Sequence, residues 1–172
     1  MGSSSASGIA PATTEPGPAV HDFDFLPGTW RVHHRRLRLR LAGSAEWDEF
    51  DGTSVAWPLL GGAGNVDDNI LELPDGRYRA ASLRSYDPAA DRWSIWWLDG
   101  RNPGRLDPPV VGGFAGGVGT FLGPDTFDGR PIVVRFQWSG ITERAARWEQ
   151  AFSADDGETW EVNWVMELTR TS

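Results

Sequence analysis

Short runs of alternating residues, separated by strong turn signals, constrain this chain more than any other feature of its sequence. The first run covers residues 30–41 and begins with Trp30, Val32, His34 and Arg36 on one side. Successive side chains of a β-strand point to opposite faces, so these four residues share one face of a strand. The apolar residues change sides near residues 35–37, which predicts a β-bulge at that point.

The same pattern recurs along the rest of the chain. Further strands are predicted over 46–57, 65–73, 77–86, 92–99, 109–123, 131–139, 145–153 and 159–170. Turn signals such as Pro74-Asp75-Gly76 separate them, and the glycine-rich run 109–123 predicts a barrel corner. No apolar period of 3.6 residues is sustained over the length of a helix. About nine or ten strands therefore predict an all-β antiparallel barrel or sandwich.

The head of the first strand carries a known signature. Gly28-Thr29-Trp30 follows a short segment, 24–28, that predicts a helical turn or loop, and Arg170 lies in the last strand. This arrangement resembles the lipocalin/calycin superfamily. A wider set of segments, including His21-Asp-Phe-Asp-Phe-Leu, Trp93-Ser-Ile-Trp-Trp and Asn163-Trp-Val-Met, resembles a family of bacterial calycin-like proteins of unassigned function.

The resemblance spans about residues 21–170 and implies a fold without an activity. The implied fold is a single antiparallel calycin-like β-barrel of about 8–10 strands with a short N-terminal helical turn. It further implies that Trp30 packs across one end of the barrel against Arg170.

Length and composition set the domain organisation and the classes of partner. The chain has 172 residues, which suits one domain over 21–172, and residues 1–20 are rich in Ser, Ala, Pro and Gly, which predicts a disordered tail. A net charge of −8 disfavours nucleic acid and acidic membranes as partners. The lack of cysteine, of an apolar run of about 20 residues and of a signal peptide predicts a cytoplasmic protein. These features fit a small-molecule ligand and leave a homodimer open.

The segment Ser153–Trp160 matches the Asp-box pattern Ser-x-Asp-x-Gly-x-Thr-Trp of sialidases and other β-proteins. Sialidase propellers carry several copies, and this chain has one. We therefore expect a structural hairpin in which Asp155 binds turn amides, Gly157 adopts a positive φ and Trp160 packs beneath the turn.

Ten tryptophans among 172 residues favour an aromatic cavity wall, with a filled core as the alternative. Four of them are predicted to face inward from the middle of strands: Trp97, Trp138, Trp148 and Trp164.

Polar residues on the same faces are candidates to orient a ligand. Arg36 follows His34 inward, and Gln150 lies between Trp148 and Phe152 in its strand. Arg84 shares a face with Tyr86, and such a pair could hold a carboxylate. The alternative places Arg84 in solvent and turns Leu83 inward.

Catalytic and metal-binding candidates are few. His34 could act as a general acid or base because its pKa is nearest neutrality, and Asp68, near a presumed barrel mouth, could act as a base or lie on a solvated turn. His33 and His34 point to opposite faces and cannot easily share an ion, so no metal site is predicted. No cofactor is predicted, and no histidine follows His34 to bind haem iron as in the nitrobindin type.

Three functional hypotheses follow. The first is binding of a small, largely apolar organic molecule in the barrel cavity. The second is a cofactor-independent enzyme, a cyclase, isomerase or dehydratase, in which His34 or Asp68 moves a proton. The third is a structural or partner-binding barrel with a filled core, which predicts that no ligand-sized cavity exists.

Overall fold

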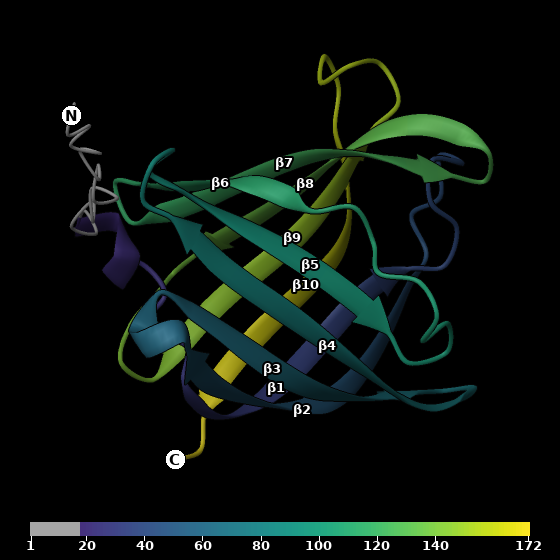
Figure 1. Cartoon of the computed structure of the whole chain (residues 1–172). Helices are drawn as coiled ribbons and strands as arrows, with labels where there is room; N and C mark the ends of the chain where they lie inside the picture. The colour runs from purple at the N-terminus through teal and green to yellow at the C-terminus, as the bar shows by residue number, and fades with distance from the viewer. Residues whose placement is uncertain (1–17) are drawn as a thin grey trace, which may run out of the picture.

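The computed structural model describes residues 18–172, which form one closed barrel of antiparallel strands (Figure 1). The strands are β1 (Gly28–Leu37), β2 (Trp47–Leu59), β3 (Gly64–Leu73), β4 (Gly76–Asp87), β5 (Arg92–Asp99), β6 (Val110–Ala115), β7 (Val118–Phe127), β8 (Arg130–Ser139), β9 (Ala145–Ser153) and β10 (Glu161–Arg170). Two short 3₁₀ turns, η1 (Pro18–His21) and η2 (Leu60–Gly62), complete the described elements. Among these residues no helix is long and apolar enough to cross a membrane.

The barrel has up-and-down topology. Every strand pairs with its neighbours in sequence, and β1 pairs with β10 to close the sheet. The closing register joins Trp30 to Arg170 at one end and Arg36 to Trp164 toward the other. The predicted fold, a single antiparallel calycin-like barrel with a short N-terminal helical turn, is confirmed.

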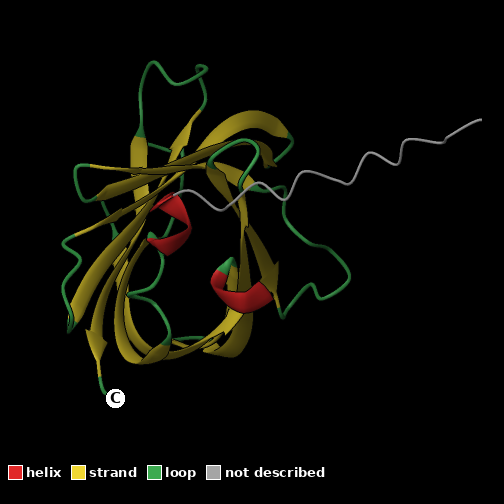
Figure 2. Cartoon of the chain, turned by 60° about the vertical axis from the view of Figure 1, so that its left-hand side comes forward, coloured by secondary structure: helices red, strands yellow, loops and turns green. Residues whose placement is uncertain are grey.

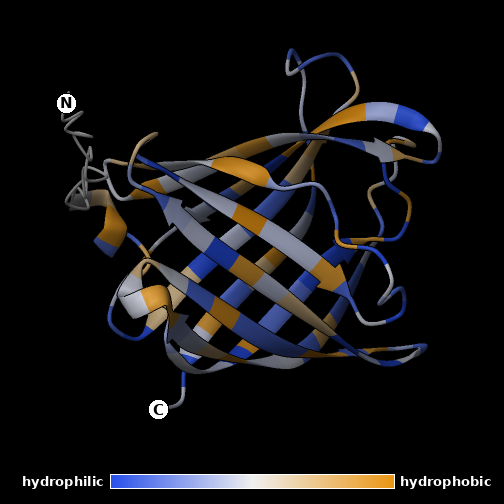
Figure 3. Cartoon of the chain, viewed as in Figure 1, coloured by the Kyte–Doolittle hydropathy of each residue, from blue (hydrophilic) through white to orange (hydrophobic). Residues whose placement is uncertain are grey.

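Apolar and polar residues alternate along the strands (Figure 3), because one face of each strand lines the interior and the other faces solvent. Three details of the prediction are wrong: the bulge near residues 35–37, the extension of the first strand to residue 41, and the barrel corner over 109–123. No bulge interrupts β1, which pairs regularly with β2 over its whole length and ends at Leu37. The irregularity lies in β10, between Val162 and Trp164. The run 109–123 is a hairpin and not a corner, since Gly116 and Gly117 turn the chain between β6 and β7 at φ 59° and 79°.

The N-terminal segment plugs one end of the barrel (Figure 2). Phe23 is buried there and meets the ring of Trp93 edge-on at 5.0 Å. The Trp93 indole donates to the carbonyl of Ala19 over 2.8 Å, and the Trp30 indole donates to that of Leu26 over 2.8 Å. Most of the predicted tail, residues 1–17, lies outside the described residues, and residues 18–20 belong to η1.

Arg170 fastens the plug to the last strand. Its guanidinium lies 4.2 Å above the centre of the Trp30 ring, as the calycin resemblance implied. It also donates to the carbonyls of Phe25, Pro27 and Glu143. One cation thus satisfies two carbonyls of the plug and one carbonyl of the loop between β8 and β9.

The opposite end, here called the mouth, is bordered by the loops 38–46, 100–109 and 154–160. The last is the Asp-box hairpin, and its structural role is confirmed. Asp155 accepts from the Thr159 backbone N–H over 2.9 Å, Gly157 has φ 89°, and the Trp160 indole donates to the Gly157 carbonyl over 3.0 Å. On the outer wall the Arg135 guanidinium stacks on Trp160, with its carbon 4.6 Å from the centre of the Trp160 ring.

Candidate ligand-binding site

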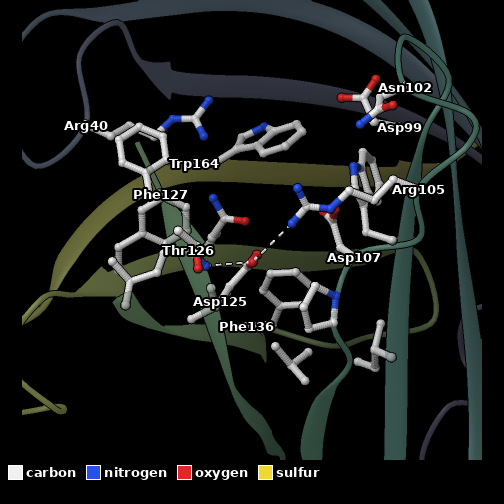
Figure 4. A pocket seen from close by; sticks show the side chains of 18 of the residues that line it. Arg40, Asp99, Asn102, Arg105, Asp107, Asp125, Thr126, Phe127, Phe136 and Trp164 are labelled. Atoms are coloured by element: carbon white, nitrogen blue, oxygen red, sulfur yellow. Dashed lines mark hydrogen bonds and ion pairs between the residues drawn. The ribbon is translucent and has the colours of Figure 1, made fainter. Parts of the chain in front are cut away.

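Two cavities of different size lie inside the barrel that residues 18–172 form. A cavity of about 260 Å³ lies at the mouth and is called the mouth cavity below (Figure 4). A smaller one of about 30 Å³, the inner cavity, lies toward the plug. Four side chains line both and so stand between them: Ile95, Trp97, Phe136 and Trp148.

The wall of the mouth cavity is a set of rings packed edge to face. The ring centres of Trp97 and Trp164 are 5.8 Å apart at 84°, and those of Trp148 and Trp164 are 5.7 Å apart at 88°. Phe136 meets Trp148 at 4.8 Å and 67°. Such arrangements are preferred by aromatic quadrupoles and hold each ring in one orientation. The structure therefore brings together three of the four tryptophans predicted from sequence, and it places the fourth, Trp138, at the inner cavity.

His34 supports this wall from behind. Its imidazole is buried, stacks on Phe50 at 4.7 Å and accepts the indole N–H of Trp164 at Nδ1 over 3.2 Å. Burial is the main cause that lowers the pKa of His34, to about 3. At neutral pH the imidazole is therefore uncharged, and it lines neither of the two cavities.

Gln150 lies on the wall of the mouth cavity between Trp148 and Phe152, as the alternation predicted. Its amide donates to Asn163 Oδ1 over 2.8 Å. Asn163 sits in the irregularity of β10 and is fully buried. The extra residue thus turns an amide toward the interior, where it fixes the orientation of Gln150.

Two half-buried arginines cover the rings from the side of β1. Arg36 comes from the end of the strand and lies 4.8 Å above the Trp164 ring centre. Arg40 comes from the loop after the strand and lies 5.7 Å and 5.9 Å from the ring centres of Phe127 and Phe152. Figure 4 shows the Arg40 guanidinium beside the Phe127 ring.

Burial disfavours the charged form of both groups. It is the largest cause that lowers the pKa of Arg36, ahead of the opposing effect of Tyr78. For Arg40, burial and then repulsion by Arg36 lower the pKa to about 10. Both guanidiniums remain charged at neutral pH, in surroundings that solvate them poorly.

The loop 100–109 contributes two further arginines, and each of these has a carboxylate partner. Arg101 donates to Asp99 over 2.7 Å and 3.0 Å and lies 3.8 Å over the ring centre of Tyr78. Arg105 forms an ion pair with Asp125 at 3.7 Å, and a dashed line marks this pair in Figure 4. The loop is tied back to the barrel, since the backbone N–H of Asp107 donates to the carbonyl of Trp97 over 2.9 Å.

The inner cavity is built around a buried ion pair. Arg84 points inward, Leu83 points outward, and the Arg84 guanidinium donates to Asp67 over 2.7 Å and to Asn65 over 3.0 Å. Both charged side chains are about 5% exposed. The inward arginine therefore has a carboxylate of this chain as its partner.

The remaining predicted residues lie away from the mouth cavity. Tyr86 is buried in the plug end of the barrel, where its hydroxyl donates to Asp91 over 2.6 Å. Asp68 points outward from β3 and forms an ion pair with Arg79. It does not line either of the two cavities.

Sequence reasoning missed several residues of the mouth cavity. Arg40, Arg101, Arg105 and Asp125 come from loops or from strand ends, where alternation gives no information about direction. Tyr78 could have been found, because it lies on the same face of β4 as Arg84 and Tyr86.

No protein-family model matches the sequence, and no curated protein matches it. Among solved structures, the chain is similar to an S-type phycobiliprotein lyase, CPES, from Guillardia theta. That match has a TM-score of 0.58 at 10% identity and covers 87% of this chain and 90% of the other. A structure of EF1p2_mFAP2b bound to DFHBI has a TM-score of 0.46 at 12% identity and covers 89% and 99%. At this identity the likeness to the lyase shows a shared fold alone.

Proposed function

We propose that this barrel binds a small, largely apolar organic molecule in the mouth cavity. The observation that carries the proposal is a cavity of about 260 Å³ inside a closed barrel, with aromatic rings in its deeper wall and charged side chains around its rim. Trp97, Trp148 and Trp164 contact the apolar body of the ligand, and Arg36 and Gln150 orient its polar group.

The size of the cavity fits this role. Ligand sites in proteins commonly have volumes of about 300–1,000 Å³ and combine apolar walls with a few polar groups. The mouth cavity lies just below that range, which favours a compact ligand. Trp138 and Arg84 lie beyond the shared wall, so they would contact only a ligand that displaces Trp97 or Phe136 and reaches the inner cavity.

Binding is favoured over the two alternative functions. A filled core does not account for a cavity of this size. The enzyme hypothesis assigns proton transfer to His34 or Asp68, and either group would have to lie within hydrogen-bonding distance of the substrate. His34 lies behind Trp164, and Asp68 lies on the outer wall, so no described contact brings either group to the cavity.

The proposal is tested by titrating the protein with N-phenyl-1-naphthylamine, a neutral aromatic dye that fluoresces in apolar surroundings. Ile132 lines the mouth cavity from β8, and its neighbour Val133 faces outward. We expect Ile132→Trp to fill the cavity and reduce dye affinity at least about tenfold, and Val133→Trp to leave it within about twofold. Equal affinities in the two variants, with circular dichroism spectra that match the parent, would place the dye elsewhere and reject the proposal.

A further inference from the structure

Building on that proposed function, we propose that the ligand of the mouth cavity is an organic monoanion. It is an aromatic molecule with one carboxylate or other oxyanion, which Arg36 and Arg40 hold at the mouth.

The first argument is the pairing of the arginines that line the two cavities. Arg84, Arg101 and Arg105 each pair with an aspartate of this chain. Among the residues that the structure describes, no carboxylate forms an ion pair with Arg36 or Arg40. Asp99 attracts Arg36 and Glu161 attracts Arg40 only from beyond ion-pair distance, so the two guanidiniums differ from the other three in lacking a contacting anion.

The second argument is the cost of that arrangement. A half-buried cation without an anion is destabilising unless something replaces its hydration. Arg36 is compensated in part by the Trp164 ring and the Tyr78 hydroxyl, and Arg40 by two phenylalanine rings. A ring face attracts the charge but leaves the N–H groups without acceptors. No described residue accepts a hydrogen bond from the Arg40 guanidinium, so its donors remain for an oxyanion.

The third argument is the local charge. Four arginines and three aspartates line the mouth cavity, which leaves one positive charge in excess. The whole chain carries −8. A local excess of the opposite sign, inside a cavity with low-dielectric walls, favours one negative charge on the ligand.

The arrangement also fixes how the ligand lies. The arginines lie over the rim-side rings, Trp164, Phe127 and Phe152, and the deeper wall is formed by Trp97, Trp148 and Phe136. The aromatic body therefore enters first, and the oxyanion stays at the rim. A guanidinium presents paired N–H groups that match the two oxygens of a carboxylate.

The experiment compares two dyes with a similar ring system. 1-Anilinonaphthalene-8-sulfonate carries one negative charge, and N-phenyl-1-naphthylamine carries none. Both are titrated into the parent protein, the Arg36→Gln/Arg40→Gln variant and an Arg38→Gln control. Arg38 is exposed on the same segment and pairs with Asp48 and Glu46, so it tests the loss of a nearby charge outside the cavity.

We expect the parent protein to bind the anionic dye at least about tenfold more tightly than the neutral dye. The double variant should lose that preference, because its affinity for the anionic dye should fall at least about tenfold more than its affinity for the neutral dye, and Arg38→Gln should leave both affinities unchanged. Arg40→Gln alone, which alters a loop residue outside the sheet, carries the same test if the double variant does not fold.

The failures are distinguishable. If both dyes bind the parent protein equally, or if the preference survives the double variant, the ligand class is wrong while the cavity remains a binding site. If neither dye binds, the proposed function fails, and the monoanion proposal fails with it.

Discussion

The indole N–H of Trp164 donates to Nδ1 of His34 over 3.2 Å, so a wall residue of the mouth cavity is held by a buried imidazole that must stay neutral. A protonated imidazole carries a hydrogen on Nδ1 and cannot accept this bond. The barrel therefore contains an acid-sensitive contact directly behind the proposed ligand site.

This contact predicts a pH dependence of stability. The pKa of His34 is about 3 in the folded chain, below its ordinary value of about 6.5, because burial disfavours the cation. Between these values only the unfolded chain takes up the proton, so stability is fully present above about pH 6.5 and falls as the pH drops toward 3, by up to about 1.4 kcal/mol for each pH unit.

We expect His34→Gln, which keeps an acceptor but does not titrate, to remove this part of the acid sensitivity. Urea denaturation at pH 7, 5.5 and 4.5 measures it. His33 remains in both proteins, so its own titration cancels in the comparison. Parallel pH profiles for the two proteins would show that His34 is not buried as a neutral group.

The Asp67–Arg84 pair predicts a large effect from a nearly isosteric change. Asp67→Asn leaves a buried guanidinium without an anion, and we expect it to lower the free energy of unfolding by about 3–5 kcal/mol. Asp68→Asn, one residue along and on the outer wall, removes only an exposed ion pair and should cost less than about 1 kcal/mol. Denaturation curves of the two variants make the comparison, and similar losses would mean that Arg84 is not buried against Asp67.

The Asp-box hairpin predicts a second acid-dependent contribution. Hydrogen bonds from Thr159, and then from Ser153, lower the pKa of Asp155 to about 2. Its ordinary value is about 3.9, so the stabilisation is fully present above about pH 4 and is lost as the pH falls toward 2.

Asp155→Asn should therefore be less stable than the parent chain at pH 6, and the difference should shrink between pH 4 and 2. Thermal unfolding over that range measures it, with Asp156→Asn in the same turn as the matched control. A difference that does not change with pH would show that the ionised carboxylate contributes nothing to the hairpin.

Arg170 predicts how the plug is held. Replacement by Met removes the donors to three carbonyls and the cation over Trp30, and we expect a loss of about 2–3 kcal/mol in the free energy of unfolding. Arg144→Met, on the exposed turn beside it, should change stability by less than about 0.5 kcal/mol. Chemical denaturation distinguishes the two variants. Equal free energies of unfolding for Arg170→Met and Arg144→Met would show that Arg170 does not hold the plug.

Alternation predicted the direction of side chains wherever a strand continues. It placed Trp97, Trp148 and Trp164 inward together, because Trp97 and Trp148 lie in regular strand and Trp164 begins the regular part of β10 that follows the irregularity. It also predicted that Arg36 faces inward, although the prediction that the strand continues to residue 41 was wrong. The chain leaves the sheet after Leu37, and Leu41 adopts φ 53° while its N–H donates to Glu161 over 2.7 Å.

The rest of the site depends on contacts between segments that are distant in sequence. Arg40 reaches the cavity because Glu161, from β10, holds the loop after β1, and no local pattern encodes that pairing. Asp67 of β3, the partner of Arg84, was missed for a different reason. Asp67 lies on the inward face of β3 with Leu71, and Asp68 lies on the outward face. Because a shift of one residue exchanges the two faces of a strand, choosing Asp68 in place of Asp67 selected the wrong face.

The central claim is that the mouth cavity is where this protein binds an aromatic ligand. A crystal structure with 6-bromo-2-naphthoate, at a concentration at least about tenfold above the dissociation constant measured in solution, tests it directly because bromine can be located by anomalous scattering. The account predicts a bromine peak beside Trp148, with the carboxylate on Arg36 and Arg40. A bromine peak confined to the outer wall, or an empty mouth cavity in the liganded crystal, would contradict it.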